Sequence, residues 1–157
     1  MDLLALADTR PVRTLAAGEM LITQGSPGGE LYVLETGRLT VERDGVKIAT
    51  VSTPGSLLGE MAVLLDKPTT ATVRADGQAK VRVIRDAREA LYGDPALTFI
   101  VAKLMATRLD STSAFLVRLS KQYQGKSEHG LLSSILSALY LPAGGDFSLV
   151  NREDLFG

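Results

Sequence analysis

The spacing of glycine residues constrains the fold of this chain more than any other feature. From Gly18 to Gly77, glycines interrupt the sequence at short intervals, and short apolar runs fill the spaces between them. Frequent turn signals between β-rich segments are typical of a sandwich or barrel. By contrast, the stretch between Pro95 and Gly125 contains neither glycine nor proline. The contrast predicts a mainly β domain that is followed by one long helix.

Several short segments of the first part have the composition of strands. Leu39 and Val41 alternate with polar residues, which is typical of a half-buried strand. Asp44-Gly45 can supply the positive φ angles of a tight hairpin. We expect a second strand pair joined at Asp76-Gly77. The expected strands are residues 31–34, 38–43, 46–51, 70–75 and 80–84.

The long helix is expected to begin at Asp94-Pro95, with the aspartate as its cap and the proline as its first residue. Its distal half repeats a seam at alternating spacings of four and three residues. The seam consists of Met105, Leu109, Thr112, Leu116, Leu119 and Tyr123. Such a heptad pattern predicts a homodimer through the helix of residues 94–124. Packing on the chain's own β-domain is the alternative, and we expect Leu97, Ile100, Val101 and Leu104 to pack in that way.

Composition limits the chemistry available to the chain. Its 157 residues allow one compact domain with an appendage, and a formal net charge of -1 gives no general attraction to nucleic acid. There is no cysteine, and the single histidine, His129, is expected to be a solvated residue at a helix start. We therefore expect no enzyme, no catalytic residue, no metal and no cofactor. Neither a membrane-spanning run nor a secretory signal is present, so a cytoplasmic location is expected.

The segment Pro54–Leu65 is the best candidate for a ligand site. A glycine at position 59 allows a close backbone approach, and the apolar run after it can form one short helix. The N–H groups at such a helix start can hold an anion. Glu60 would then accept hydrogen bonds from a sugar hydroxyl, as acids do in dinucleotide sites. A loop glycine followed by a solvated glutamate is the alternative interpretation.

Three motifs together resemble the cyclic-nucleotide-binding domain family: Leu31-Tyr32-Val33-Leu34 with Gly37, Gly55–Leu65, and Pro68–Ala75. The resemblance covers about Arg13 to Leu119. It implies a mainly β fold, a jelly-roll-like double-stranded β-helix roll with flanking helices and a long C-terminal dimerisation helix. It also implies that cyclic AMP or cyclic GMP binds between the roll and the long helix.

The resemblance assigns roles to individual residues. It implies that Gly59, Met61 and Ala62 offer backbone N–H groups and that Glu60 binds the ribose 2′-hydroxyl. Thr70 would place its hydroxyl near the cyclic phosphate, where a threonine of cyclic-GMP-selective relatives also meets the guanine.

One position departs from the family pattern, because the family's phosphate-binding arginine falls on Thr69. Losing one partner of a buried charge-assisted pair costs about 2–5 kcal/mol. Lys67 and Arg74 are the nearest cations, and we expect both to be solvated surface charges, although Lys67 could swing in. Thr69 therefore supports an alternative function: a ligand-independent dimerisation or protein-interaction module.

The second half of the chain extends the likeness to the catabolite activator family. The stretch ending in Thr112-Ser113 resembles a segment in which the threonine meets the adenine and the serine reaches it from the partner subunit. Small polar filler on a helix is the alternative. Residues 131–157 resemble the start of a winged-helix DNA-binding domain, with an expected helix over 131–140 and a strand over 147–150. The recognition helix is missing, so no DNA binding is expected from this chain as given.

The sequence thus predicts a regulatory domain that binds a cyclic nucleotide and transmits the bound state through its long helix. The expected parts are 1–93, the β-roll with an N-terminal helix; 94–124, the lid and dimer helix; and 125–157, a partial winged-helix remnant. A further alternative is that the chain is the N-terminal fragment of a transcription regulator, or a natural truncation of one.

Overall fold

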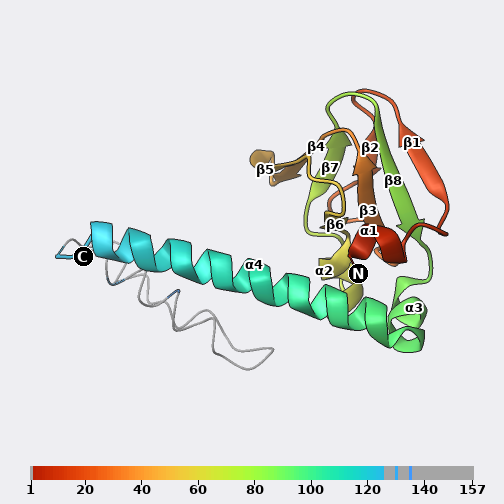
Figure 1. Cartoon of the computed structure of the whole chain (residues 1–157). Helices are drawn as coiled ribbons and strands as arrows, with labels where there is room; N and C mark the ends of the chain where they lie inside the picture. Colours follow the sequence, from red (N-terminus) through yellow and green to blue (C-terminus); the bar gives the residue numbers. More distant parts are fainter. Residues whose placement is uncertain (1, 126–129, 131–134, 136–157) are drawn as a thin grey trace. The chain divides into compact units, whose positions relative to one another are not determined.

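A computed structural model describes residues 2–125 together with positions 130 and 135 (Figure 1). Residues up to Ala102 form one compact unit, and the chain from Lys103 onward forms a second. The expected features of the C-terminal segment lie outside the described residues: His129, the helix over 131–140, the strand over 147–150 and the winged-helix remnant. The predicted boundaries at 93/94 and 124/125 stay predictions.

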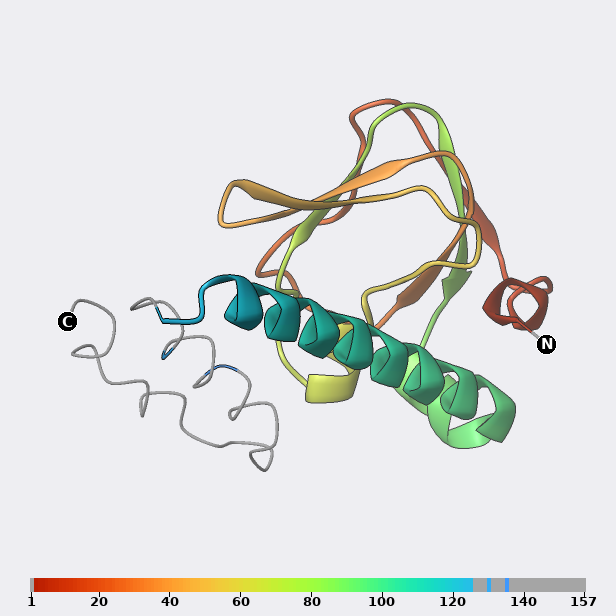
Figure 2. The same cartoon turned by 60° about the vertical axis from the view of Figure 1, so that its left-hand side comes forward.

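Within the described part of the chain, eight strands form two antiparallel four-stranded sheets, which curl around one interior (Figure 2). The first sheet has the order β1 (Val12–Leu15), β8 (Ala79–Ile84), β3 (Leu31–Thr36) and β6 (Leu57–Leu58). The second has the order β2 (Met20–Ile22), β7 (Thr72–Ala75), β4 (Leu39–Arg43) and β5 (Val46–Val51). Apolar side chains from both sheets, among them Leu15, Leu34, Leu39 and Val81, form the core between them. The prediction of a mainly β roll is confirmed.

The two expected strand pairs had different outcomes. Asp44 and Gly45 have φ angles of 51° and 75°, and they close the β4–β5 hairpin as predicted. The prediction of the second strand pair is wrong. Strand β7 pairs with β2 and β4, whereas β8 pairs with β1 and β3. Asp76 and Gly77 both lack the positive φ that a primed turn requires. The chain instead crosses from one sheet to the other at this point.

The N-terminal segment is tied to the outer face of the first sheet by Arg82. Its Nη1 donates to the carbonyl oxygens of Asp8 at 2.7 Å and Arg10 at 3.1 Å, and its Nε lies 2.8 Å from Glu35 Oε2. The helix α1 (Leu3–Leu6) precedes this tie, and the Pro11 carbonyl accepts from Val83 N at 2.9 Å. These contacts fix the start of β1, which lines one of the cavities described below.

The helix α3 (Ala87–Gly93) leads into α4 (Pro95–Gln122). Asp94 Oδ1 accepts from Ala96 N at 3.0 Å and Leu97 N at 3.1 Å, so the predicted cap is confirmed. Leu97 and Val101 are buried within the first unit, as expected for the start of this helix. Among the described residues, no helix is long and apolar enough to cross a bilayer.

Candidate functional site

The short strand β6 delivers the chain directly into helix α2 (Glu60–Leu65), and Gly59 is the residue between them. Gly59 has a φ of 88°, and a Cβ at this position would lie 2.6 Å from the Glu30 carbonyl oxygen. Both facts require glycine here. The structure shows a close backbone approach of Gly59 to the Glu30 carbonyl, and the predicted approach to a ligand stays a prediction.

Helix α2 has a buried face and an exposed apolar face. Glu60, Ala62 and Val63 are buried, with Glu60 only 7% exposed. Met61, Leu64 and Leu65 are 42%, 47% and 53% exposed. The short helix is as predicted, but Glu60 is not the solvated residue of the alternative interpretation. An acidic residue is rarely buried to this extent in a protein, so this carboxyl group is a functional candidate.

Thr69 is held in place by a set of hydrogen bonds that we call the Thr69–Ser26 junction. Its Oγ1 donates to the Thr23 carbonyl oxygen at 2.6 Å and accepts from Ser26 N at 3.1 Å. The Thr69 backbone N also donates to the Ser26 carbonyl oxygen at 2.9 Å, and Gly25 N donates to the Thr69 carbonyl oxygen at 2.8 Å. The side chain at this position therefore joins two loops and brings no positive charge.

Three polar residues near Thr69 in the sequence differ in their exposure and hydrogen bonding: Lys67, Thr70 and Arg74. Thr70 is half-buried, and its hydroxyl makes no hydrogen bond to another described residue. Arg74 Nη1 lies 3.4 Å from the Gly18 carbonyl oxygen, toward the other end of β7. Lys67 is exposed and lines a cavity of about 300 Å³ together with Ala62 and Arg88.

A second cavity, of about 340 Å³, includes both Gly59 and Thr69, and we call it the cassette cavity. Its remaining walls are Leu21, Ile22, Thr23, Ser26, Pro27, Gly28, Gly29, Glu30 and Tyr32. The only charged residue among these described lining residues is Glu30, and none of them is a cation. Of the predicted site residues, it brings together Gly59 and Thr69, while Glu60 and Met61 lie on the adjoining helix.

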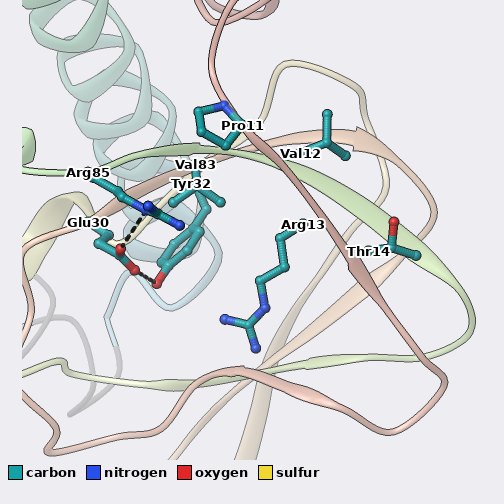
Figure 3. A pocket seen from close by; sticks show the side chains of 8 residues that line it. All are labelled: Pro11, Val12, Arg13, Thr14, Glu30, Tyr32, Val83 and Arg85. Atoms are coloured by element: carbon teal, nitrogen blue, oxygen red, sulfur yellow. Dashed lines mark hydrogen bonds and ion pairs between the residues drawn. The ribbon is translucent and has the colours of Figure 1, made fainter.

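A third cavity, of about 410 Å³, contains Arg13 and Arg85, and we call it the Arg13 cavity (Figure 3). The Tyr32 hydroxyl donates to Glu30 Oε2 at 2.6 Å, and Arg85 Nε lies 4.0 Å from Glu30 Oε1. Burial and the neighbouring Glu30 carboxylate raise the pKa of Tyr32 above its ordinary value of 10.0. Tyr32 and Glu30 line this cavity and the cassette cavity alike.

Sequence reasoning missed the pairing of Glu30 with Tyr32. In the sequence, Tyr32 falls in an expected buried strand and in a family motif, and neither pattern assigns a partner to its hydroxyl. A signal was available, because residues two apart in an extended segment face the same side. An acid and a phenol at that spacing can meet.

Thr112 and Ser113 lie on α4 in the second unit, whereas the cavities lie in the first. The Thr112 hydroxyl donates to the Arg108 carbonyl oxygen and the Ser113 hydroxyl donates to the Leu109 carbonyl oxygen, each at 2.8 Å. Such bonds to the preceding helical turn are common for these residue types. The proposed role of both residues at a base stays a prediction.

An antiparallel roll with a short helix between two strands and a long helix after them is the architecture that the sequence motifs implied. It defines a ligand-binding regulatory fold. The pattern of the cyclic nucleotide-binding domain family matches residues 12–90, which is just over half of the chain, and the chain therefore belongs to this family.

Similar curated proteins share this region. The chain is 38% identical over 90 residues to a cAMP-dependent protein kinase regulatory subunit of Emericella nidulans, covering 56% of this chain and 22% of that protein. It is 41% identical over 69 residues to the acetyltransferase Pat of Mycolicibacterium smegmatis, covering 42% of this chain and 20% of that protein. The match thus spans about a fifth of the length of these relatives.

Solved structures support the same fold. The catabolite activator protein of Thermus thermophilus has a TM-score of 0.62 at 25% identity, covering 74% of this chain and 58% of that chain. The N-terminal domain of a transcriptional regulator from Streptomyces coelicolor has a TM-score of 0.53 at 31% identity. This match covers 69% of this chain and 79% of that chain. The region is thus a cyclic nucleotide-binding domain, homologous to kinase regulatory subunits and to proteins of the catabolite activator type.

Proposed function

We propose that this chain binds cyclic AMP or cyclic GMP beside α2 and transmits the bound state through α4. The observation that carries the proposal is the start of α2, where a left-handed glycine is followed by a buried acid. Glu60 would bind the ribose 2′-hydroxyl, and the backbone N–H groups of Gly59, Met61 and Ala62 would meet the rest of the nucleotide. Thr70 would offer its hydroxyl to the cyclic phosphate.

Transmission would use the exposed apolar face of α2. Met61, Leu64 and Leu65 leave an apolar surface that burial would stabilise, at about 25 cal/mol per Å². A nucleotide that binds better when α4 covers this face would shift the equilibrium toward the covered state. Thr112 and Ser113 would contact the base in that state.

We expect this binding to be weak. No described residue that lines the cassette cavity is a cation, and the Thr69 hydroxyl is engaged in the junction with Ser26. A missing charge-assisted partner costs about 2–5 kcal/mol, and every 1.4 kcal/mol changes affinity by about tenfold. The nucleotide's negative charge would then be met mainly by backbone N–H groups.

Calorimetric titration with cyclic AMP and cyclic GMP tests the proposal, with 5′-AMP as the non-cyclic control. We expect saturable binding of one cyclic nucleotide and weaker binding of 5′-AMP. If neither cyclic nucleotide binds at millimolar concentration, the nucleotide function fails. The chain would then be a ligand-independent interaction module.

We also propose a homodimer through residues 94–124. On the described part of α4, Leu109 and Phe115 are 49% and 52% exposed, which favours an apolar partner surface. Leu116→Glu should weaken the dimer because it places a charge in the seam. Ser111→Glu adds the same charge at an exposed position off the seam and is the control. Sedimentation that finds a monomer at tens of micromolar for the unaltered chain would contradict the dimer.

No cofactor, catalytic activity or DNA binding is proposed for this chain. Its cytoplasmic location stays a prediction.

A further inference from the structure

The Arg13 cavity has the composition of a binding site for an anion. Of its eight lining residues, two are arginines and one is an acid, and Pro11 and Val83 supply apolar side chains. Its volume of about 410 Å³ lies in the range of small-molecule sites. Arginine presents five N–H donors in a planar fork, which suits carboxylate and phosphate groups.

The residues of this cavity come from three neighbouring strands of one sheet, β1, β3 and β8, and from the positions just before or after them. Tyr32 is paired with Val83, and Arg13 is paired with Val81. Directly opposed residues of an antiparallel pair project from the same face. Tyr32, Val81 and Val83 belong to the core cluster, so the Arg13 side chain projects from the inner face of the sheet. In the view of Figure 3, the Tyr32 ring lies between Arg13 and the Glu30–Arg85 pair.

Both arginines are only partly engaged. Arg13 uses Nη2 alone, toward Glu19 Oε1 at 3.3 Å and the Met20 carbonyl oxygen at 3.5 Å. Arg85 has a single ion pair with a described residue, in which its Nε lies 4.0 Å from Glu30 Oε1, and its side chain is 72% exposed. Each guanidinium thus keeps N–H donors for a further acceptor.

We propose that the Arg13 cavity binds a small organic oxyanion, with its acid group attracted by the positive charges of Arg13 and Arg85 and its apolar part against Pro11 and Val83. The oxyanion can be a phosphate or a carboxylate, since a guanidinium pairs with both. Glu30 and the Tyr32 hydroxyl form the remaining polar wall and favour a ligand with one acid group over a polyanion.

Binding in the Arg13 cavity would influence binding at the nucleotide site. This second part of the inference rests on the proposed function. Glu30 and Tyr32 belong to both cavities. The Glu30 carbonyl is the group against which Gly59 packs, and its carboxylate meets the Tyr32 hydroxyl and Arg85. An oxyanion that draws Arg85 away from Glu30 would alter the contacts of Glu30, which is the residue that supports the start of α2. Binding at the two cavities would then be coupled, and the coupling would be reciprocal.

The test uses the full chain and three probes: phenyl phosphate, benzoate and inorganic phosphate, each at constant ionic strength. We expect phenyl phosphate or benzoate to shift the NMR signals of residues 12–14, 30–32 and 83–85 and the Nε–H signals of Arg13 and Arg85. Comparing these two probes distinguishes a phosphate site from a carboxylate site. Inorganic phosphate should bind more weakly because it has no apolar part to pack against Pro11 and Val83.

The variants Arg85→Gln and Arg13→Gln should each weaken binding of the better probe by about tenfold, the expected size for a charge-assisted contact. The control is Arg38→Gln, since Arg38 is also an exposed arginine with one acidic partner, Asp76 at 3.5 Å. Arg85 lies just beyond β8 and is mostly exposed, so its variant should fold even if the Arg13 variant does not. Shifts centred on other residues, or an equal loss for Arg38→Gln, would overturn the site.

The coupling is tested by titrating cyclic AMP with and without a saturating amount of the better probe. We expect the affinity for cyclic AMP to change by at least threefold, and the affinity for the probe to change by the same factor when cyclic AMP saturates. An unchanged affinity would overturn the coupling. If the probe binds at the cavity but cyclic AMP does not bind at all, the oxyanion site stands and the proposed nucleotide function fails.

Discussion

The cassette cavity and the Arg13 cavity share a wall, yet their charges differ. The first is lined by hydroxyl groups, glycines and one acid, whereas the second has two guanidinium groups beside the same acid. Of these two cavities, only the Arg13 cavity has positively charged residues among its described walls, and Gly59 and Thr69 lie in the other one. Under the proposed function, nucleotide recognition beside α2 would rely on the Glu60 carboxyl group, on backbone N–H groups and on the Thr70 hydroxyl.

The largest expected effect comes from Glu60→Gln, which keeps the volume of the buried side chain and removes its charge. We expect cyclic-nucleotide affinity to fall by about thirtyfold or more, because a charged acceptor of the ribose hydroxyl is replaced by a weaker neutral amide oxygen in a buried position. Probe binding in the Arg13 cavity should be unchanged. Calorimetry measures both.

Glu89→Gln is the matched control for this change, because Glu89 is an exposed glutamate on the neighbouring helix α3. If measurable nucleotide binding survives Glu60→Gln at full strength, the proposed contact with the ribose is wrong. Thermal unfolding checks that both variants remain folded.

Local patterns predicted much of the molecule. Alternation and the Asp44-Gly45 dipeptide predicted β4 and β5, and Asp94-Pro95 predicted the start of α4. Gly59 and the apolar run after it predicted α2. Each of these features depends on residues close together in the sequence, where backbone sterics and hydrogen bonding to the nearest turn decide the outcome.

Features that depend on distant residues could not be predicted in this way. The separation of β7 and β8 into two sheets follows from their pairing with β2, β4, β1 and β3. The Thr69–Ser26 junction joins residues 43 apart. The Arg13 cavity needs three strands in register. The sequence showed that the family arginine was missing but not that the Thr69 hydroxyl was already engaged.

A smaller effect is expected from Tyr32→Phe, which removes the hydroxyl from the wall common to the two cavities. The 2.6 Å hydrogen bond to Glu30 is part-buried, so its loss should lower the free energy of unfolding by about 1–2 kcal/mol. Denaturant unfolding measures the change. Tyr92→Phe, at an 84% exposed position, should have no effect. An equal change in both variants would show that the Tyr32–Glu30 bond does not stabilise the wall.

The smallest expected effect concerns Glu19, which holds Arg13 at the edge of its cavity. The backbone N–H of Ala16 and the Arg13 guanidinium keep the pKa of Glu19 below its ordinary value of 4.5. Because the folded pKa is the lower one, this stabilisation is present above pH 4.5 and is lost as the pH falls through the folded value. Glu19→Gln should therefore lower the melting temperature slightly at pH 7 and by less as the pH falls below 4.5. The same difference at pH 7 and at pH 3 would contradict this role.

The most direct test of the account compares cyclic AMP binding to the unaltered chain, Thr69→Arg and Thr69→Val in calorimetric titrations. Both variants lose the hydroxyl bonds to Thr23 and Ser26, so Thr69→Val separates the cost of breaking the junction from the effect of added charge. We predict weak binding by the unaltered chain, no gain in Thr69→Val, and a gain of about tenfold or more in Thr69→Arg, since a charge-assisted pair is worth about 1.5–3 kcal/mol. Tight binding by the unaltered chain that Thr69→Arg leaves unchanged or weakens would contradict the claim that this site lacks a cation for its nucleotide.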